Sequence, residues 1–257
     1  MNQSDLLVNL AGLGFVIIFF ALMIGFMILA RRQPRRRYLR EISAYTTLRR
    51  GIGLAVEAGQ RLHISVGHGG ISGIKGGSAL VGLSMLQRIA RAASISDRPP
   101  VSTSGEAISA ILSQDTLRTV YTSIGAAEQY NPDSGQLSGV TPFSYAAGAI
   151  PVIYDQQVSV NILSGHFGSE VALITDAAER SGGTSLAGSD NITAQAVLYA
   201  SAQEPLIGEE IFVGGAYINV NPMHLASLRA QDILRWALIG IILVGALFKL
   251  LVGGSVP

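Results

Sequence analysis

Cysteine is absent from this sequence of 257 residues. Its absence excludes disulfides, thiolate zinc sites and cysteine nucleophiles, and it suits a reducing compartment. Charged residues are also scarce, at 14% of the chain, and they are unevenly placed: residues 31–40 hold six arginines, whereas residues 41–230 hold ten Lys and Arg against fifteen Asp and Glu. The mildly acidic central part argues against nucleic acid as a partner.

Long apolar runs, by contrast, lie near both ends of the chain. Residues 6–30 contain no charged side chain, and residues 233–252 contain only Arg235 and Lys249. In a helix, about 20 apolar residues cross a hydrocarbon core of about 30 Å. A cleaved signal peptide would need positive charge before the first run, but Asp5 precedes that run and the arginines follow it. We therefore predict transmembrane helices at 6–30 and 233–252.

The arginines after the first run predict the orientation of the chain. Because arginine stays on the cytoplasmic side of a membrane, both termini are predicted to be external, and residues 42–228 are predicted to form the cytoplasmic domain of a plasma-membrane protein. Residues 31–41 are interpreted as a basic collar that anionic lipid headgroups attract by about 1 kcal/mol per charge. The predicted lipid-facing side chains are Arg31, Arg32, Arg35, Arg36, Arg37 and Arg40.

Helical and extended patterns alternate between the two spans. Helices are predicted at 42–58, ended by Gly59, and at 79–93, 106–128, 143–150, 192–202 and 208–217. Strands are predicted at 62–66, with one face buried, and at 101–103, 158–163, 170–175 and 184–187. Thr103 and Glu106 have capping-box spacing, and Ser189 or Asp190 is predicted to cap the helix at 192. The pattern predicts one layered α/β domain with a mostly parallel, Rossmann-like sheet and flanking helices.

A glycine-rich loop, residues 67–78, joins the first predicted strand to the next helix. Backbone N–H groups in such a turn, together with the helix N-terminus, can cradle an anion. Two standard phosphate fingerprints fail, because Lys75 is followed by two glycines and Ser72 stands where the dinucleotide motif needs glycine. Tight packing against a helix or a second subunit is the alternative interpretation. The candidate cradle consists of Gly69, Gly70, Ser72, Gly73, Lys75, Gly76, Gly77 and Ser78.

Five further polar residues are candidates for a pocket beside this loop. Ser104 has the position of a helix cap, and a role as nucleophile lacks the Gly-x-Ser-x-Gly pattern. His166 and Glu170 flank a loop, and together with Glu209 and Glu210 they are candidates to bind a divalent metal or to transfer protons. The alternative places the paired glutamates at the positive end of a helix dipole. We assign no metal ligands, and the pattern identifies no cofactor.

Two short motifs carry a resemblance to a known family. The Gly-x-Phe-Gly-x-Glu turn occupies residues 165–170, and an Ile-Gly-Glu-Glu run occupies residues 207–210. In these motifs the chain resembles a family of membrane-anchored bacterial and archaeal proteins that is catalogued as a domain of unknown function. The likeness covers most of residues 45–220. It implies a tethered arrangement and a common fold, and it assigns no role to any residue.

Taken together, these patterns predict a membrane-tethered cytoplasmic domain with a structural, interaction or ligand-sensing role. The abundance of glycine, 30 residues, favours close backbone approach and self-association into a homo-oligomer. The alternative is an enzyme that acts on a phosphorylated or nucleotide-like small molecule at the loop 67–78. A set of polar groups that converge on this loop would favour ligand binding or catalysis, whereas apolar side chains sealing it would favour a scaffold.

Overall fold

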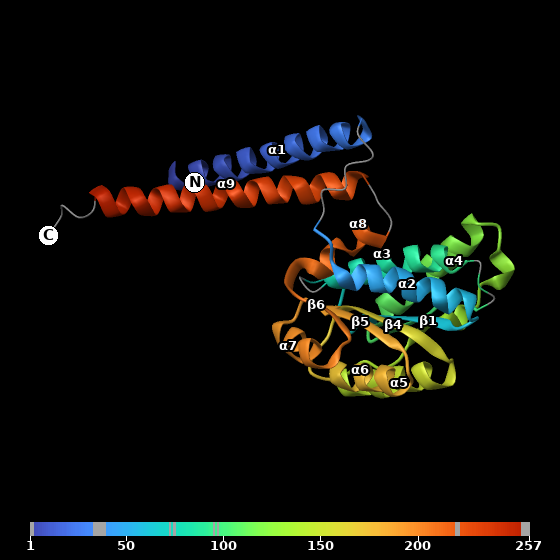
Figure 1. The fold of residues 1–257 in the computed structure, drawn as a ribbon. Coiled ribbons are helices and arrows are strands. Elements are labelled where there is room, and N and C mark those ends of the chain that lie inside the picture. The colour runs from blue at the N-terminus through green and yellow to red at the C-terminus, as the bar shows by residue number, and fades with distance from the viewer. Residues whose placement is uncertain are drawn as a thin grey trace. The chain divides into compact units, whose positions relative to one another are not determined.

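The computed structural model describes residues 3–32, 40–71, 73, 76–94, 96, 98–218 and 222–252, and the chain divides into two units. The first unit contains the terminal helices α1 (Gln3–Arg32) and α9 (Pro222–Val252), which are in contact with each other (Figure 1). Val8–Leu29 and Met223–Leu251 are long and apolar enough to cross a membrane, on length and composition alone. Both predicted spans therefore fall on continuous apolar helices.

The second unit, Arg40–Asn219, is built on a six-stranded sheet with the order β3-β2-β1-β4-β5-β6. All of its strand pairs are parallel. The strands are β1 (Arg61–Gly67), β2 (Val101–Ser104), β3 (Gly135–Leu137), β4 (Val158–His166), β5 (Thr184–Ser189) and β6 (Glu204–Leu206). This is the strand order of dinucleotide-binding folds, so the predicted Rossmann-like α/β class is confirmed.

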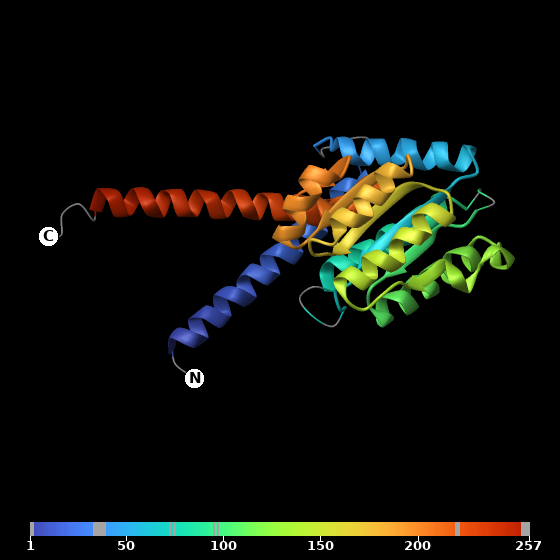
Figure 2. The same cartoon turned by 90° about the horizontal axis from the view of Figure 1, so that it is seen from below.

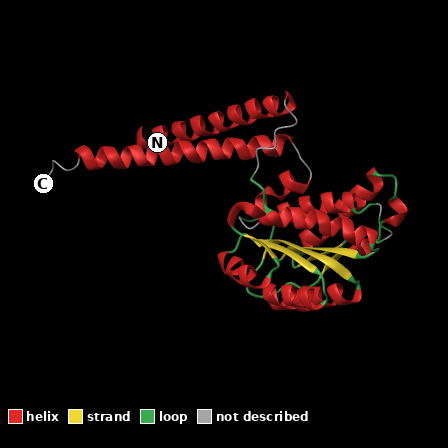
Figure 3. Ribbon diagram, in the orientation of Figure 1, coloured by secondary structure: helices red, strands yellow, loops and turns green. Residues whose placement is uncertain are grey.

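Helices cover both faces of the sheet, as parallel strands require (Figures 1 and 3). One face carries α2 (Ser43–Glu57), α3 (Gly76–Ala92) and α4 (Ala107–Ser123). The other face carries α5 (Pro142–Asp155), α6 (Val171–Arg180) and α7 (Ile192–Ser201). Figure 2 looks onto this second face, with yellow helices in front of the strands. Short pieces complete the unit: η1 (Ala127–Gln129), η2 (Pro132–Ser134), η3 (Gly208–Val213) and α8 (Gly214–Ile218).

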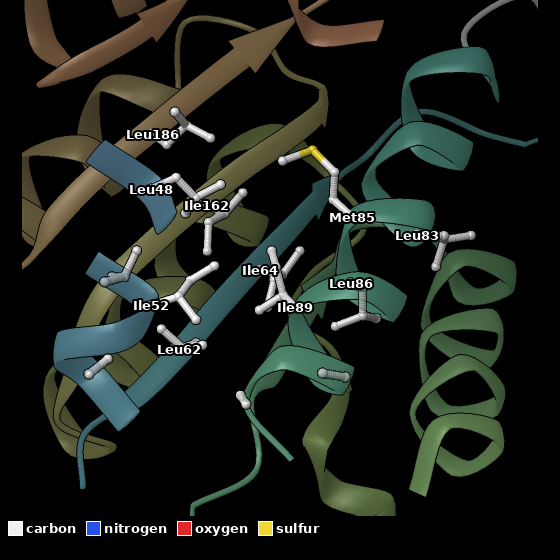
Figure 4. Packing of buried hydrophobic residues seen from close by; sticks show 14 of the residues in the cluster. Leu48, Ile52, Leu62, Ile64, Leu83, Met85, Leu86, Ile89, Ile162 and Leu186 are labelled. Carbon is white, nitrogen blue, oxygen red and sulfur yellow. The ribbon is translucent and has the colours of Figure 1, made fainter. Parts of the chain in front are cut away.

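Each face of the sheet has its own apolar core. Figure 4 shows the first core, in which Leu48 and Ile52 of α2 and Met85 and Ile89 of α3 point toward the aliphatic side chains of β1, β4 and β5. The second core lies between the sheet and α5, α6 and α7, and its largest members are Tyr145, Ile153, Leu163, Phe167, Ile174 and Leu198. Burying one such side chain fully contributes about 1.5–3 kcal/mol, so both helical layers are held firmly on the strands.

The prediction that β1 is buried on one face only is wrong. Every residue from Leu62 to Gly67 is buried, including His63 and Ser65. β1 lies in the middle of the sheet, and α5 covers the face to which these two polar side chains point. In β1, the alternation of polar and apolar residues therefore indicates a buried polar network beneath a helix, and not a solvent-exposed face.

Three local predictions are corrected by the topology. The segment 170–175 is not a strand: it begins α6, the crossover that parallel β4 and β5 need between them. Thr103 does not cap α4, because it belongs to β2, and Glu106 is the N-cap and accepts from Ser109 N. The cap of α7 is Asn191. The three-residue edge strands β3 and β6 were not predicted. The helix 42–58 and the role of Gly59, with φ +64°, are confirmed.

Candidate functional site

The order of strands in the sheet reverses between β1 and β4. β2 and β3 lie on one side of β1, whereas β4, β5 and β6 follow on its other side. The loop after β1 leads to α3 on one face of the sheet, and the loop after β4 leads to α6 on the other face. Ligands of open α/β sheets bind beyond the carboxyl ends of the strands at such a switch point. Two histidines stand there, because His68 directly follows β1 and His166 ends β4.

Close backbone approach brings the two histidines together. Gly67 has φ +76°, and a Cβ atom there would collide with the carbonyl group of His166. A Cβ on Gly165 would collide in the same way with the carbonyl group of Val66. Glycine is therefore required on both strands. The His68 N–H donates to the His166 carbonyl at 3.0 Å, and the two rings lie 5.6 Å apart with their planes at 82°.

Each histidine is held by its own carboxylate. His68 Nε2 lies 2.8 Å from Glu170 Oε1, which also accepts from the N–H of Gly168 at 2.7 Å. His166 Nδ1 lies 2.7 Å from Asp190 Oδ1. An ionised carboxylate only accepts hydrogen bonds, so the imidazoles donate. Nδ1 of His68 and Nε2 of His166 make no hydrogen bond to any side chain or backbone group that the structure describes, and they can meet a ligand.

The two pairs are mostly enclosed. The Glu170 side chain is 2% exposed, and those of His68 and His166 are 17% and 11% exposed. Buried carboxylates are stable only when they are well hydrogen-bonded, and each of these has two donors. The second donor to Asp190 is the hydroxyl of Ser78 in α3, at 3.1 Å. A pair of oriented imidazoles with one outer nitrogen each can donate or accept a proton.

A buried polar network lies beneath the histidines. His63 contacts Asn161 Oδ1 with Nδ1 at 3.0 Å and Thr103 Oγ1 with Nε2 at 2.8 Å. The Tyr145 hydroxyl reaches Thr103 Oγ1 at 3.2 Å and also Ser65 Oγ. Burial lowers the pKa of His63 to about 4 and raises the pKa of Tyr145. Because the Tyr145 ring lies 6.4 Å from the ring of His68, this neutral network supports the floor of the site.

The glycine loop lies where the sequence predicts, between β1 and α3 at the carboxyl edge. Gly69, Gly70, Gly73, Gly76, Gly77 and Ser78 are described, whereas Ser72 and Lys75 lie outside the described residues. A Cβ on Gly76 would collide with the Ile71 carbonyl, so this turn needs glycine at 76. A Cβ on Gly77 would make only an ordinary contact with Phe212, at 3.9 Å. Ser78, through Asp190, connects the loop to His166.

The predicted pocket residues are only partly brought together. His166 and Glu170 lie at the switch point, each bonded to a different partner. Ser104 ends β2; it is not a helix cap, and its buried Oγ has no hydrogen-bond partner within the described ranges. Glu209 and Glu210 lie in η3, after the edge strand β6.

Glu210 pairs with Arg40 at 2.6 Å and also accepts weakly from Ile207 N at 3.4 Å. The grouping of Glu210 with His166 is therefore replaced by a separate ion pair. Among the other arginines of the predicted collar, Arg35, Arg36 and Arg37 lie outside the described residues, and Arg31 and Arg32 end α1. No three His, Asp or Glu side chains gather into a metal-holding group in the parts of the chain described above.

Sequence reasoning missed His68, Asp190 and Tyr145 as site residues. His68 and Asp190 directly follow β1 and β5, and the position after a parallel strand is the signal that could have found them. Tyr145 gives no such signal, because it lies within α5 and reaches the network only through packing.

Comparison with known proteins identifies a family. The family model described as a domain of unknown function, DUF6754, matches residues 5–255. The match covers nearly the whole chain, and the chain belongs to this family. The resemblance carried by residues 165–170 and 207–210 is thereby confirmed at the level of a domain of unknown function. No curated protein and no solved structure matches the chain.

Proposed function

We propose that this member of the DUF6754 family is a membrane-tethered, ligand-sensing domain that binds a phosphorylated or nucleotide-like small molecule at the switch point. The observation that carries the proposal is the reversal of strand order between β1 and β4. It brings the glycine loop, the N-terminus of α3 and the pair His68 and His166 to one edge of the sheet. Backbone N–H groups and a helix N-terminus favour phosphate oxygens.

Two carboxylates at the site would repel an anion if they were uncompensated. Glu170 accepts from His68 and from Gly168 N, and Asp190 accepts from His166 and Ser78. Donors of the protein therefore engage Oε1 of Glu170 and both oxygens of Asp190. The outer nitrogens of the two imidazoles are the groups assigned to meet a ligand. Ligand contact is assigned to these nitrogens and to the loop backbone.

The test uses the full chain in detergent, with thermal unfolding followed in the presence of ADP, NAD⁺ or pyrophosphate. We expect at least one of them to raise the melting temperature. His166→Gln should weaken that ligand about tenfold, since one hydrogen bond contributes about 1–1.5 kcal/mol. Gly76→Ala should abolish the effect by collision with the Ile71 carbonyl, while Gly77→Ala, which meets only Phe212 at 3.9 Å, should keep it. No shift with any of the three compounds would contradict the proposal.

Catalysis at the same site is the second candidate, and the two His–carboxylate pairs favour it. An imidazole held by a carboxylate through one nitrogen can act as a general acid or base through the other. If the domain is an enzyme, the stabilising compound should be converted during incubation, and His68→Gln should stop conversion. Recovery of the compound unchanged would leave sensing as the function.

The tether is proposed to place both termini outside the cell and the α/β unit in the cytoplasm of a plasma-membrane protein. Because the chain has no cysteine, single cysteines report topology cleanly. Ser4→Cys and Ser255→Cys should react with an impermeant thiol reagent in intact cells, and Ser123→Cys, at an exposed position at the end of α4, should not. Reaction at position 123 alone would invert the topology.

Lipid contact by the arginine collar is proposed from the six arginines of residues 31–40. Replacing Arg35, Arg36 and Arg37 by Gln should weaken binding of a fragment without spans to anionic vesicles, most strongly at low salt. Unchanged binding would leave the arginines as a topology signal only.

Self-association is supported by exposed apolar side chains near the β3 edge of the sheet. These are Ile108, Ile111, Leu137, Val140 and Phe143, which are 50%, 62%, 49%, 72% and 65% exposed. An edge strand with apolar neighbours is a common place for a second copy to pack. Phe143→Ser should reduce the size of the detergent-solubilised protein, while Tyr199→Ser, at a 75% exposed position of α7, should not. Equal sizes for wild type and Phe143→Ser would exclude this surface.

A further inference from the structure

The opposite, amino edge of the sheet contains a pocket of about 570 Å³. It lies among the turns that enter β1, β2, β4 and β5, and its polar lining comes from Gln60, Arg98, Gln157, Ser159 and Ser181. Its volume is within the range of small-molecule sites, about 300–1,000 Å³. Among the described residues, the lining contains no carboxylate, and its full charge is the positive charge of Arg98.

A second arginine adjoins the pocket. Arg61 begins β1, and its guanidinium is close enough to Arg98 to be repelled by it. Burial, and then this repulsion, lower the pKa of Arg61. Two like charges that are held together destabilise each other unless an opposite charge joins them. The arrangement therefore favours an anion.

Neutral amides are the partners that the protein supplies to these guanidinium groups. Arg98 Nη1 donates to Gln157 Oε1 at 2.7 Å, and Arg61 Nη1 donates to Gln156 Oε1. Across the described residues, neither arginine forms an ion pair. A guanidinium group has five N–H donors in a planar fork that matches phosphate or carboxylate oxygens. Arg98 is exposed, so its remaining donors are open to an anion from solution.

Buried polar atoms without partners surround the same place. Arg61 Nε, Ser159 Oγ and the Tyr121 hydroxyl are buried and make no hydrogen bond with the described part of the chain. Tyr121 faces Arg61, and Ser159 lines the pocket. Buried donors without a partner are rare in folded proteins, and a bound ion or water usually accounts for them. Here they lie beside two guanidinium groups that form no ion pair within the described ranges.

We infer that this pocket binds a phosphate group, held by the guanidinium groups of Arg61 and Arg98 and by the Ser159 hydroxyl. The phosphate belongs either to a soluble phosphorylated molecule or to a lipid headgroup, since both present the same oxygens. Binding here is separate from the switch point, which lies at the other end of the strands. The amino edge is not where ligands of this fold class react, so the site is assigned to an effector rather than to a substrate.

The experiment measures thermal unfolding of the full chain in detergent, in sodium phosphate or in sodium chloride of equal ionic strength. Phosphate should stabilise the wild type. Arg98→Gln should weaken the apparent affinity about tenfold to a hundredfold, as expected for loss of a charge-assisted contact. Arg50→Gln, which removes an equal charge from an exposed position on α2, should change nothing, and His166→Gln should also keep the response.

A second arm distinguishes the two sources of phosphate. The same variants are placed in nanodiscs of phosphatidylglycerol or of phosphatidylcholine. Stabilisation by phosphatidylglycerol that is lost in Arg98→Gln, but kept in Arg50→Gln, identifies a headgroup, whereas a response to soluble phosphate alone identifies a soluble ligand. The inference is overturned if neither form of phosphate stabilises the wild type, if both arginine variants lose the response equally, or if only His166→Gln loses it.

Discussion

The two edges of one sheet compensate their charges in opposite ways. At the carboxyl edge, Glu170 and Asp190 each meet a histidine and a second donor. At the amino edge, the described side chains that accept hydrogen bonds from the guanidinium groups of Arg61 and Arg98 are the amides of Gln156 and Gln157. A carboxylate that accepts two hydrogen bonds from the protein makes the structure around it rigid, whereas an arginine bonded to a neutral amide can still bind an external anion. The charged side chains of the carboxyl edge are therefore held in place by partners in the protein, and the arginines of the amino edge remain able to bind an anion.

The two edges also differ in how closely neighbouring backbone segments approach each other. Gly67 at the carboxyl edge and Gly59 at the amino edge both have positive φ, +76° and +64°. A Cβ on Gly67 would collide with the backbone of His166, while a Cβ on Gly59 would meet nothing within 4 Å. The conformation alone requires glycine at 59, and conformation together with packing requires it at 67. The comparison shows that the site is built by close contact between two strands.

The largest expected effect separates these two glycines. Gly59→Ala should cost about 1–2 kcal/mol, the cost of a left-handed conformation. Gly67→Ala adds a backbone collision and should cost more than about 4 kcal/mol. Thermal unfolding measures both, at roughly 2–4 °C per kcal/mol for a protein of this size. Similar losses for the two variants would mean that β1 and β4 separate easily at the switch point.

The next effect concerns His63, which is fully buried in the sheet between the two edges and contacts the neutral side chains of Asn161 and Thr103. Its pKa is lowered from 6.5 to about 4 by burial. Between pH 6.5 and pH 4 the unfolded chain binds a proton at this histidine and the folded chain does not. The contribution of His63 to the free energy of unfolding is therefore fully present above pH 6.5 and is lost as the pH falls toward 4. The loss amounts to about 3 kcal/mol.

Unfolding across pH 4–7 checks this expectation, with His63→Gln as the matched variant. The variant should lack the part of the pH dependence that belongs to the histidine. A wild type and a variant with the same slope would show that the folded protein accepts a proton at His63, and that the network of Asn161 and Thr103 rearranges to allow it.

The smallest effect is the difference between charge removal at the two edges. Glu170→Gln should cost about 1–3 kcal/mol, because it removes a charge-assisted partner of half-buried His68. Arg98→Gln should change stability by less than about 0.5 kcal/mol in phosphate-free buffer, since relief of its repulsion with Arg61 offsets the lost bond to Gln157. Thermal unfolding of both variants measures the two losses of stability. If Arg98→Gln is the more damaging change, the amino edge is already compensated.

Much of the fold could be predicted because its signals are local. The β-branched run 158–163 predicts β4, and Gly59 marks the end of α2. The strand prediction for residues 170–175 failed because a short apolar run suits a helix and a strand equally. The edge strands β3 and β6 have three residues each, and strands so short form only because a neighbouring strand is present to pair with them.

The candidate site could be predicted only in part for the same reason. Glycines mark the loop after β1 by their composition. The partners of the histidines, however, lie far away in the chain: 102 residues separate His68 from Glu170, and 24 separate His166 from Asp190. Glu210 resembles a site residue in sequence and yet pairs with Arg40. Spacing alone does not distinguish these outcomes.

The sequence by itself determined two long apolar runs, a basic segment after the first one, and a glycine loop between a strand and a helix. These follow from length, charge and φ, which are properties of neighbouring residues. Only the tertiary structure decided that His68 meets Glu170, that His166 meets Asp190, and that Arg61 lies near Arg98 at the amino edge of the sheet. The order of strands in the sheet selects those partners, and strand order results from packing among residues that are distant in the chain.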